Sequence, residues 1–277
     1  MDRLSFTSAW KPAARCPAAW KAERDGLIAR EVKPCYATGS LFHAALLTPD
    51  RVSAVLAEYG DLLVLQKASK TGPAGSPNAA AREAQHDGLY VRQLPAVAAL
   101  LNGAQCEVEI TFALDGVPWV AHVDCITAAG CILDAKTCRD IEGTEWCPVR
   151  RCRRPWHETM LYWHQLAVYR HARGPETVPA VGLIACQSFD DGFPAVRIIE
   201  RAQQDADILD RAAEDVALSM RHEWVSPLTG RTLPPFAEML ETPADDLPRC
   251  ESPNCAWCRR TPRDIYYTYS AEREPGL

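Results

Sequence analysis

The chain has 277 residues, and its 30 lysines and arginines against 36 aspartates and glutamates give a formal net charge of −6 at pH 7. Apolar residues make up 47% of the chain and charged residues 24%, which is ordinary for a globular protein. This composition excludes a disordered tail protein and a generally basic nucleic-acid coat. A chain of this length buries enough surface to fold without help from disulfides or metals.

Hydropathy and cysteine content bear on the compartment of the protein. The longest apolar run, around residues 178–186, has the length of a buried strand and falls short of the ~18 residues that a membrane span needs. The first residues, Met-Asp-Arg-Leu-Ser, lack the apolar segment of a signal peptide, so we expect a cytoplasmic protein without membrane contact. In a reducing compartment the 12 cysteines are expected to be metal or cluster ligands, or small buried residues, rather than disulfides.

Helical patterns come first along the chain. Apolar residues recur with helical spacing over residues 41–59, which places His43 in the first turns of a predicted helix. A loop rich in glycine, proline and serine follows at 67–77. Two further helices are predicted over 79–85 and 94–101.

Strand patterns then replace the helical ones. Alternation predicts successive strands over residues 106–114, 117–126 and 131–136, and a helix follows over 156–173. The last predicted elements are two strands over 181–187 and 195–200 around an Asp190-Asp191-Gly192 turn, a helix over 201–222, and a proline-rich tail.

The order helix, strand, strand, strand, helix, strand predicts an α/β (α+β) fold in which helices flank a central sheet. We expect residues 1–277 to form a single domain with its core over about 36–200. Residues 1–35 then form an N-terminal segment, and residues 201–277 form a helical, cysteine-bearing C-terminal extension.

Acidic side chains and one lysine fall on the three successive strands. Glu109 lies on the first strand, Asp124 near the end of the second, and Asp134 with Lys136 at the end of the third. Adjacent strands lie ~4.8 Å apart and residues two apart share a face, so these groups can converge. Carboxylates suit Mg²⁺ or Mn²⁺, and a nearby lysine can orient the attacking water or stabilise charge on phosphorus.

Asp124 is the most informative of these acids. An Asp-x-Lys at a strand end is usually a solvated terminus or a salt bridge. Asp124, however, lies inside an otherwise apolar strand, where an unpaired carboxylate is costly. A bound metal ion would explain its presence there.

The motifs of this region, taken in order, resemble those of PD-(D/E)XK nucleases of the RecB-like branch. The family's motifs appear as Gly-x-x-x-His at 39–43, Glu-x-x-Phe at 109–112, Asp-x-Lys-Thr at 134–137 and Gln-x-x-x-Tyr at 165–169. Its Gly-x-Ile-Asp strand appears at 121–124, with Ala121 in place of the glycine. The set covers about 130 residues, from 39 to 169.

The resemblance implies a restriction-endonuclease-like core with a central mixed sheet, and a role for each matching residue. It implies Mg²⁺ or Mn²⁺ as the cofactor, with His43, Glu109, Asp124 and Asp134 as its ligands. It also implies Lys136 as the water-orienting or charge-stabilising residue, and Gln165 and Tyr169 as residues that steady the lysine or the substrate strand. Glu107, on the same predicted strand face, is the alternative to Glu109, and Gln165 with Tyr169 also fits a half-buried polar pair.

Several members of the same family hold a 4Fe-4S cluster with one cysteine before the nuclease core and three after it. Cys16, in Cys-Pro-x-x-Trp, and the tail cysteines Cys250, Cys255 and Cys258 resemble that arrangement. Four thiolates suit either an iron–sulfur cluster or Zn²⁺. Cys35 is the alternative to Cys16, and Cys147, Cys152 and His157 form a weaker second set.

A cluster of arginines offers the local positive charge that DNA requires in spite of the net negative charge. It consists of Arg150, Arg151, Arg153 and Arg154. Trp146 and Trp156 flank the cluster, and their rings are candidates to stack on unpaired bases. A solvated basic loop explains the same arginines equally well.

Together these features predict a metal-dependent deoxyribonuclease that hydrolyses phosphodiester bonds, as an exonuclease in recombination, repair or phage DNA metabolism. Its expected partners are DNA and a recombinase or helicase. The alternatives are a CRISPR-type DNA-processing nuclease and a catalytically silent DNA-binding module of the same fold. The acids and Lys136 argue against the silent module, and the lack of a Gly-x₄-Gly-Lys-Ser/Thr loop excludes a helicase within this chain.

Overall fold

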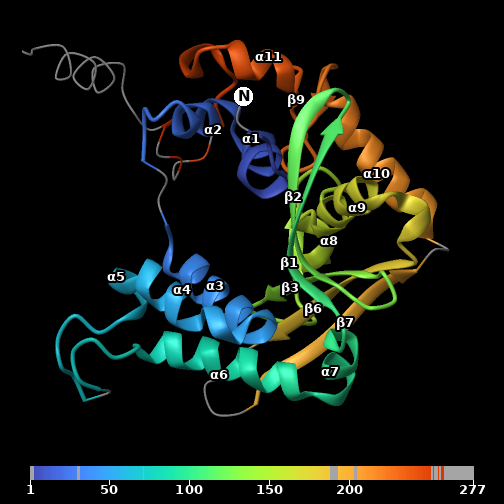
Figure 1. Cartoon of the computed structure of the whole chain (residues 1–277). Helices are drawn as coiled ribbons and strands as arrows, with labels where there is room; N and C mark the ends of the chain where they lie inside the picture. Colours follow the sequence, from blue (N-terminus) through green and yellow to red (C-terminus); the bar gives the residue numbers. More distant parts are fainter. Residues whose placement is uncertain are drawn as a thin grey trace, which may run out of the picture.

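A five-stranded sheet with the order β1-β2-β3-β6-β7 lies at the centre of the molecule (Figure 1). Its strands are β1 (Gln105–Leu114), β2 (Val117–Ile126), β3 (Ile132–Thr137), β6 (Ala180–Gln187) and β7 (Ala195–Ala202). β3 and β6 are parallel, and the other neighbouring strands are antiparallel. The structure is a computed structural model that describes residues 3–29, 32–70, 72–187, 193–202 and 205–250, together with residues 252, 255, 257 and 258.

Helices cover both faces of this sheet. On one face lie α3 (Pro34–Leu47), α6 (Ala79–Gln93) and α7 (Pro95–Leu101), and on the other lie α9 (Tyr162–Arg173) and α10 (Ala206–Leu218). Phe42 of α3 and Leu133 of β3 belong to one apolar cluster, whereas Leu166 of α9 and Val181 of β6 belong to another. The predicted α/β (α+β) fold, a mixed sheet flanked by helices, is therefore confirmed.

The helix predicted over residues 41–59 is interrupted. α3 ends at Leu47, Pro49–Arg51 form a single 3₁₀ turn, and α4 (Val52–Glu58) follows. Pro49 ends the helix because its ring clashes with the preceding turn and its nitrogen has no hydrogen to donate. The break turns the chain beside His43, and Arg51 consequently reaches the same pocket as His43.

The helix predicted over residues 156–173 is also broken, into α8 (Trp156–Thr159) and α9. Leu161 separates the two with a left-handed φ of 61°, although its side chain is buried. The arginine-rich stretch before α8 forms a two-stranded hairpin of β4 (Thr144–Cys147) and β5 (Cys152–Pro155). The sequence patterns did not predict these two strands.

The two ends of the chain pack against each other beside the sheet (Figure 1). The N-terminal segment contributes a π-helical turn η1 (Phe6–Trp10), α1 (Lys11–Arg15) and α2 (Pro17–Arg24), and the C-terminal part contributes α11 (Phe236–Glu241). Trp10, Trp20 and Phe236 are buried in one cluster with Trp119 of β2. The smaller elements are α5 (Gly60–Leu63), β8 (Trp224–Val225) and β9 (Thr232–Leu233).

The predicted turn at Asp190–Gly192 lies outside the described residues. Within the described part of the chain, no helix has both the length and the apolarity required to cross a membrane.

Candidate active site

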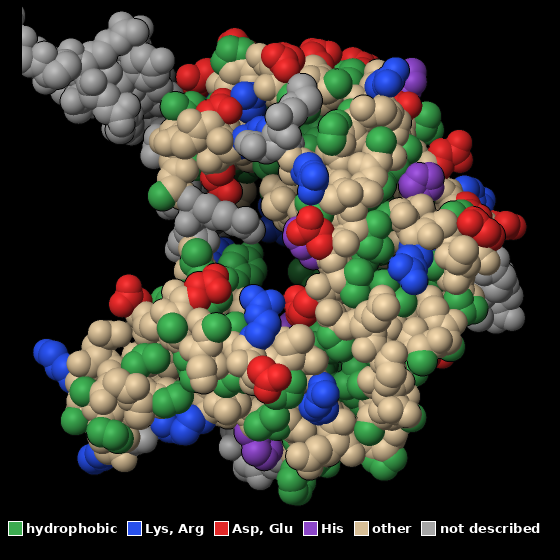
Figure 2. Space-filling model, in the orientation of Figure 1, with side chains coloured by type: hydrophobic (Ala, Val, Ile, Leu, Met, Phe, Trp, Pro, Cys, Tyr) green, Lys and Arg blue, Asp and Glu red, His purple; other side chains and the backbone are tan. Residues whose placement is uncertain are grey.

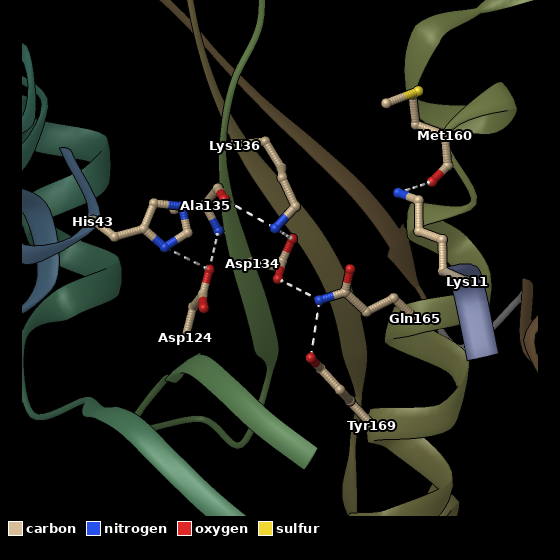
Figure 3. A network of polar contacts seen from close by, with 9 residues as sticks. All are labelled: Lys11, His43, Asp124, Asp134, Ala135, Lys136, Met160, Gln165 and Tyr169. Atoms are coloured by element: carbon tan, nitrogen blue, oxygen red, sulfur yellow. Dashed lines mark hydrogen bonds and ion pairs between the residues drawn. The ribbon is translucent and has the colours of Figure 1, made fainter. Parts of the chain in front are cut away.

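Three side chains that can ligate a metal meet at one end of the sheet. His43 comes from α3, Glu107 from β1 and Asp124 from β2, and one ligand atom from each lies within 4.8 Å of the others. His43 Nδ1 lies 3.4 Å from Asp124 Oδ2, and this same oxygen accepts a 2.8 Å hydrogen bond from the Ala135 N–H (Figure 3). The backbone of β3 thus fixes the Asp124 carboxylate beside the imidazole.

The structure brings Glu107, and not Glu109, to His43 and Asp124. Glu107 has a left-handed φ of 55°, which interrupts the alternation of β1. Cys106 therefore packs with the α3 face of the sheet and Val108 with the α9 face, although they are two residues apart. Glu109 instead lies 3.5 Å from Arg3 with 56% of its side chain exposed. Glu107 lines the pocket with His43 and Asp124 whereas Glu109 does not, so the geometry favours the alternative, Glu107, as the candidate ligand.

A second group of polar side chains adjoins these three residues. The Lys136 ammonium forms an ion pair with Asp134 Oδ2 and donates to the Ala135 carbonyl at 3.2 Å. The Gln165 amide of α9 donates to Asp134 Oδ1 and to the Tyr169 hydroxyl, both at 2.9 Å (Figure 3). Gln165 and Tyr169 therefore position Asp134, and through it Lys136.

Charge and burial set the protonation of this second group. Burial raises the pKa of Asp134 to about 6, although the Lys136 ammonium opposes that rise. Burial alone would lower the pKa of Lys136, but the Asp134 and Asp124 carboxylates outweigh it and raise that pKa above its ordinary value. Lys136 therefore carries a positive charge at neutral pH, and in this arrangement it stabilises negative charge rather than removing a proton.

A pocket of about 200 Å³ opens at His43, Glu107 and Asp124. Arg51 and Tyr59 line it together with these three residues. Figure 2 shows the molecule hollowed between the α3–α6 region and the part formed by the two chain ends. Arg51 has no carboxylate within 4.0 Å among the described residues, so its charge is available to an anion in the pocket.

The donor set of this pocket fits a divalent cation. Ligand atoms around one octahedral ion at about 2.1 Å lie about 3.0 to 4.2 Å apart, close to the spacing of the His43, Glu107 and Asp124 atoms. Two carboxylates suit Mg²⁺ and Mn²⁺, and the imidazole nitrogen is the softer ligand that Mn²⁺ tolerates better than Mg²⁺. Asp134, the fourth predicted ligand, lies outside this set of three and is held by Lys136 and Gln165.

The four cysteines predicted from the two ends of the chain lie together. One sulfur from each of Cys16, Cys250, Cys255 and Cys258 lies within 4.8 Å of the others. The Cys16 sulfur is 3.5 Å from that of Cys258 and 3.9 Å from that of Cys255, and Cys250 is 3.7 Å from Cys258. Burial raises the pKa of the Cys16 thiol to about 11, so a cation bound there must displace protons.

These sulfur spacings fit one tetrahedral ion. Four thiolates 2.3 Å from a central Zn²⁺ lie about 3.8 Å from one another, which matches the observed 3.5 to 3.9 Å. A four-iron cluster binds each thiolate through a separate iron, and this holds the sulfurs farther apart. The alternative ligand Cys35 is exposed and does not belong to the group.

The remaining predicted groups are partly engaged elsewhere. Arg153 donates to Thr144, and Arg154 pairs with Glu158, which leaves Arg150 and Arg151 exposed at the hairpin tip. Trp146 is 58% exposed, whereas Trp156 is buried and its indole N–H donates to the Ile141 carbonyl. Trp156 is therefore not available to stack on a base.

The weaker cysteine and histidine set is not assembled in the described part of the chain. Cys147 and Cys152 lie opposite each other in the β4–β5 register, but His157 Nδ1 accepts a hydrogen bond from the Trp163 indole at 3.1 Å. No metal-binding group of three includes them among the described residues.

Sequence reasoning missed two cations and one aromatic ring at this site. Arg51 enters the pocket because of the break at Pro49, which the apolar spacing of residues 41–59 concealed. Lys11 and Tyr162 lie on the other side of Lys136, and the Tyr162 ring centroid is 4.8 Å from Lys11 Nζ. Pro49 was a local signal that could have been used, whereas the Lys11 contact is long-range and has no local signal.

Comparison with known proteins places this architecture in a family. The model of a family described as "PDDEXK-like domain of unknown function (DUF3799)" matches residues 6–179. The chain belongs to this family, and so to the PD-(D/E)XK superfamily that the motifs indicated. The match extends from η1 through α9 and includes every residue of the site described above except the three C-terminal cysteines.

Solved structures support the fold. A crystal structure of a "Putative exonuclease" from Eubacterium rectale is similar over 94% of this chain and 88% of its own, with a TM-score of 0.70 and 15% identity. A second crystal structure, of SSO0001, covers 73% of this chain and 83% of its own at 17% identity, but its TM-score of 0.28 carries no argument. No curated protein sequence gives a significant match.

Proposed function

We propose that this chain is a metal-dependent DNA nuclease. The observation that carries the proposal is the meeting of His43, Glu107 and Asp124 beside the Asp134–Lys136 ion pair. Membership in the PDDEXK-like family supports hydrolysis of phosphodiester bonds, and the name given to the E. rectale neighbour supports an exonuclease.

The proposed chemistry divides between the two halves of the site. His43, Glu107 and Asp124 would hold Mg²⁺ or Mn²⁺, and the bound ion would supply an activated water and neutralise phosphate charge. Lys136, kept protonated by Asp134 and Asp124, would stabilise the negative charge that develops on the phosphoryl oxygens. Gln165 would keep Asp134 in place as charge moves.

A cation in the pocket and exposed arginines elsewhere on the molecule support a polyanionic substrate. Arg51 lines the pocket, and Arg150 and Arg151 are exposed at the tip of the hairpin that joins β3 to α8. Local charge of this kind attracts a phosphate backbone even when the net charge is −6. We propose DNA as the substrate, in recombination, repair or phage DNA metabolism, with a recombinase or helicase as a further partner.

We also propose that the four cysteines hold a structural Zn²⁺. Their sulfur spacing and their position inside the cluster that joins the two chain ends support a closed, four-ligand site. Metal analysis of anaerobically purified protein tests this, with one zinc per chain as the expected result. Four irons per chain with absorption near 400 nm would favour the iron–sulfur alternative. Protein that contains neither zinc nor iron would contradict the proposal of a bound metal.

Cleavage of end-labelled DNA tests the nuclease proposal. Single- and double-stranded substrates are incubated with Mg²⁺ or Mn²⁺ and with wild type, Lys136→Ala or Asp124→Asn. We expect wild type to cleave and each variant to lose activity by at least about 100-fold, because each removes a group that acts on the reacting phosphate. Equal cleavage by all three proteins would show that the activity belongs to a contaminant or another site.

A further inference from the structure

The N-terminal segment brings two cations to the side of Lys136 that faces away from His43. Lys11 Nζ donates to the Met160 carbonyl at 2.7 Å, and Lys11 and Asp124 lie on opposite sides of the Asp134–Lys136 pair (Figure 3). Lys11 Nζ and Lys136 Nζ lie 4.8 and 5.2 Å from the centroid of the same Tyr162 ring, so at most 10.0 Å separates the two nitrogens. Arg15 is one helical turn beyond Lys11 on α1.

These two cations have no acidic partner. In the described part of the chain no carboxylate lies within 4.0 Å of Lys11 or Arg15, whereas Lys136 has Asp134. Like charges four residues apart on a helix repel each other. Burial, Lys136 and Arg15 together lower the pKa of Lys11 to about 8. Lys11 and Arg15 therefore add positive charge beside Lys136 without a carboxylate of their own within 4.0 Å among the described residues, although the Asp134 carboxylate partly opposes the fall in the Lys11 pKa.

Three anchors hold the segment that carries these cations. Leu4 exchanges backbone hydrogen bonds with β2, to the Pro118 carbonyl at 3.1 Å and from the Val120 N–H at 2.7 Å. The buried Trp10 indole donates to Ser219 at 2.8 Å, and Cys16 lies in the four-cysteine group. The backbone of Lys11 and Arg15 lies between these anchors, and the bond to Met160 also holds the Lys11 ammonium, so the phosphate contact at Lys11 costs little ordering entropy.

We propose that Lys11 and Arg15 bind backbone phosphates of the DNA strand that enters the active site. The proposal rests on the proposed nuclease function and gives the substrate a path: the strand passes from the Arg51 pocket, across Lys136, to α1. Lys136, Lys11 and the following turn of α1 offer successive positive charges to the phosphates of one strand. The Tyr162 ring stacks under Lys11 and Lys136 as a fixed support for both ammonium groups.

Salt dependence of DNA binding tests this role. A fluorescent single-stranded oligonucleotide is titrated at several salt concentrations with the full chain carrying Asp124→Asn, which prevents cleavage. Each phosphate contact that is lost reduces the slope of log K against log salt by about 0.7 on a single strand. We expect Lys11→Met and Arg15→Met each to reduce the slope by about that amount, and the double variant by about twice as much.

Matched variants separate charge from structure. Lys11→Arg and Arg15→Lys keep the charge and are expected to keep the slope, and Lys70→Met, an exposed lysine on the distant 64–77 loop, is the control. The Arg15 side chain is exposed, so we expect Arg15→Glu to keep the fold. This variant therefore tests the proposal even where Lys11→Met lowers the melting temperature. A slope unchanged in Arg15→Glu and in the double variant, or reduced equally by Lys70→Met, would overturn the proposal.

The salt titration together with the cleavage assay distinguishes this inference from the nuclease proposal. If wild type cleaves DNA through Lys136 but the slopes of the α1 variants are unchanged, the nuclease proposal holds and only the proposed phosphate contacts are wrong. If wild type neither binds nor cleaves DNA, both proposals are wrong.

Discussion

The two candidate metal centres of this chain differ in ligands, in access and in what surrounds them. His43, Glu107 and Asp124 offer two carboxylates and one imidazole around an open pocket with Arg51 on its wall. Cys16, Cys250, Cys255 and Cys258 offer four sulfurs that pack against the buried cluster joining the two chain ends. An incomplete protein ligand set leaves positions for water and substrate, whereas a set of four cysteines leaves none.

Under the proposed function, this difference gives the chemistry to the first centre and a stabilising role to the second. The two are also linked in the structure, because the helix α1 that ends next to Cys16 carries Lys11 toward Lys136. Loss of the metal ion at the cysteines should therefore affect the active site only by changing the position of α1. The predictions below separate the two centres, beginning with the largest effect.

Removal of the hard metal ion should abolish cleavage. Treatment with EDTA is expected to reduce DNA cleavage by more than about 100-fold, and added Mg²⁺ or Mn²⁺ should restore it, because the oxygen ligands bind these ions reversibly. Cleavage rates and bound zinc are measured on the same samples. Cleavage that persists in EDTA while the bound zinc is retained would contradict the assignment of chemistry to the carboxylate centre.

Substitution of each glutamate of β1 by glutamine should show which of the two binds the metal ion. Glu107→Gln is expected to lower metal-dependent cleavage by at least about 10-fold, with a higher Mg²⁺ or Mn²⁺ requirement, because it removes one carboxylate of the pocket. Glu109→Gln should change the rate less than two-fold, since its exposed carboxylate pairs with Arg3 alone among the residues that the structure describes. Titration of the rate with metal gives both numbers, and the reverse order of effects would restore Glu109 as the ligand.

Loss of one cysteine ligand should destabilise the protein before it affects catalysis. Cys255→Ser is expected to lose the bound metal and to lower the melting temperature by on the order of 5 °C, because the joined chain ends lose a cross-link. The exposed Cys35→Ser provides the control. A Cys255→Ser protein that keeps its metal and melting temperature would show that the cysteines are only buried thiols.

Acidification should act at the interface between the N-terminal segment and α9. His164 stacks 6.1 Å from the Trp10 ring, and burial lowers the pKa of His164 to about 4. The folded state therefore binds fewer protons than the unfolded state between about pH 6.5 and 4, so His164 stabilises the fold above that range and loses the contribution as the pH falls. The loss is about 3 kcal/mol at most.

Urea unfolding at several pH values measures this contribution. His164→Phe should flatten the fall in the free energy of unfolding between pH 6.5 and 4. The exposed His122→Gln should leave it unchanged. Identical pH profiles for His164→Phe and wild type would show that His164 does not link pH to stability.

The parts of the site that follow strand and helix periodicity could be predicted from the sequence. Asp134 and Lys136 are two apart on β3, and Gln165 and Tyr169 are four apart on α9, and the structure joins both pairs in one hydrogen-bonded network. Cys16 and the tail cysteines could be grouped through the family resemblance, even though 234 residues separate Cys16 from Cys250.

The rest could not be predicted, and the reasons are local strain and long-range packing. The left-handed φ of Glu107 interrupts the alternation of β1 beside His43 and Asp124, and no glycine or proline marks that position. The left-handed Leu161 likewise breaks a helix that the pattern extends without interruption. The contact of Lys11 with α9 depends on how the N-terminal segment packs, and spacing along the chain contains no information on it.

A crystal of the protein with Mn²⁺ tests the central claim most directly, because anomalous scattering places the ion without reference to activity. The account predicts an anomalous peak in the pocket, within coordination distance of His43, Glu107 and Asp124 and lost in Asp124→Asn. A peak that leaves these three residues uncoordinated, in crystals of protein that cleaves DNA with Mn²⁺, would contradict it.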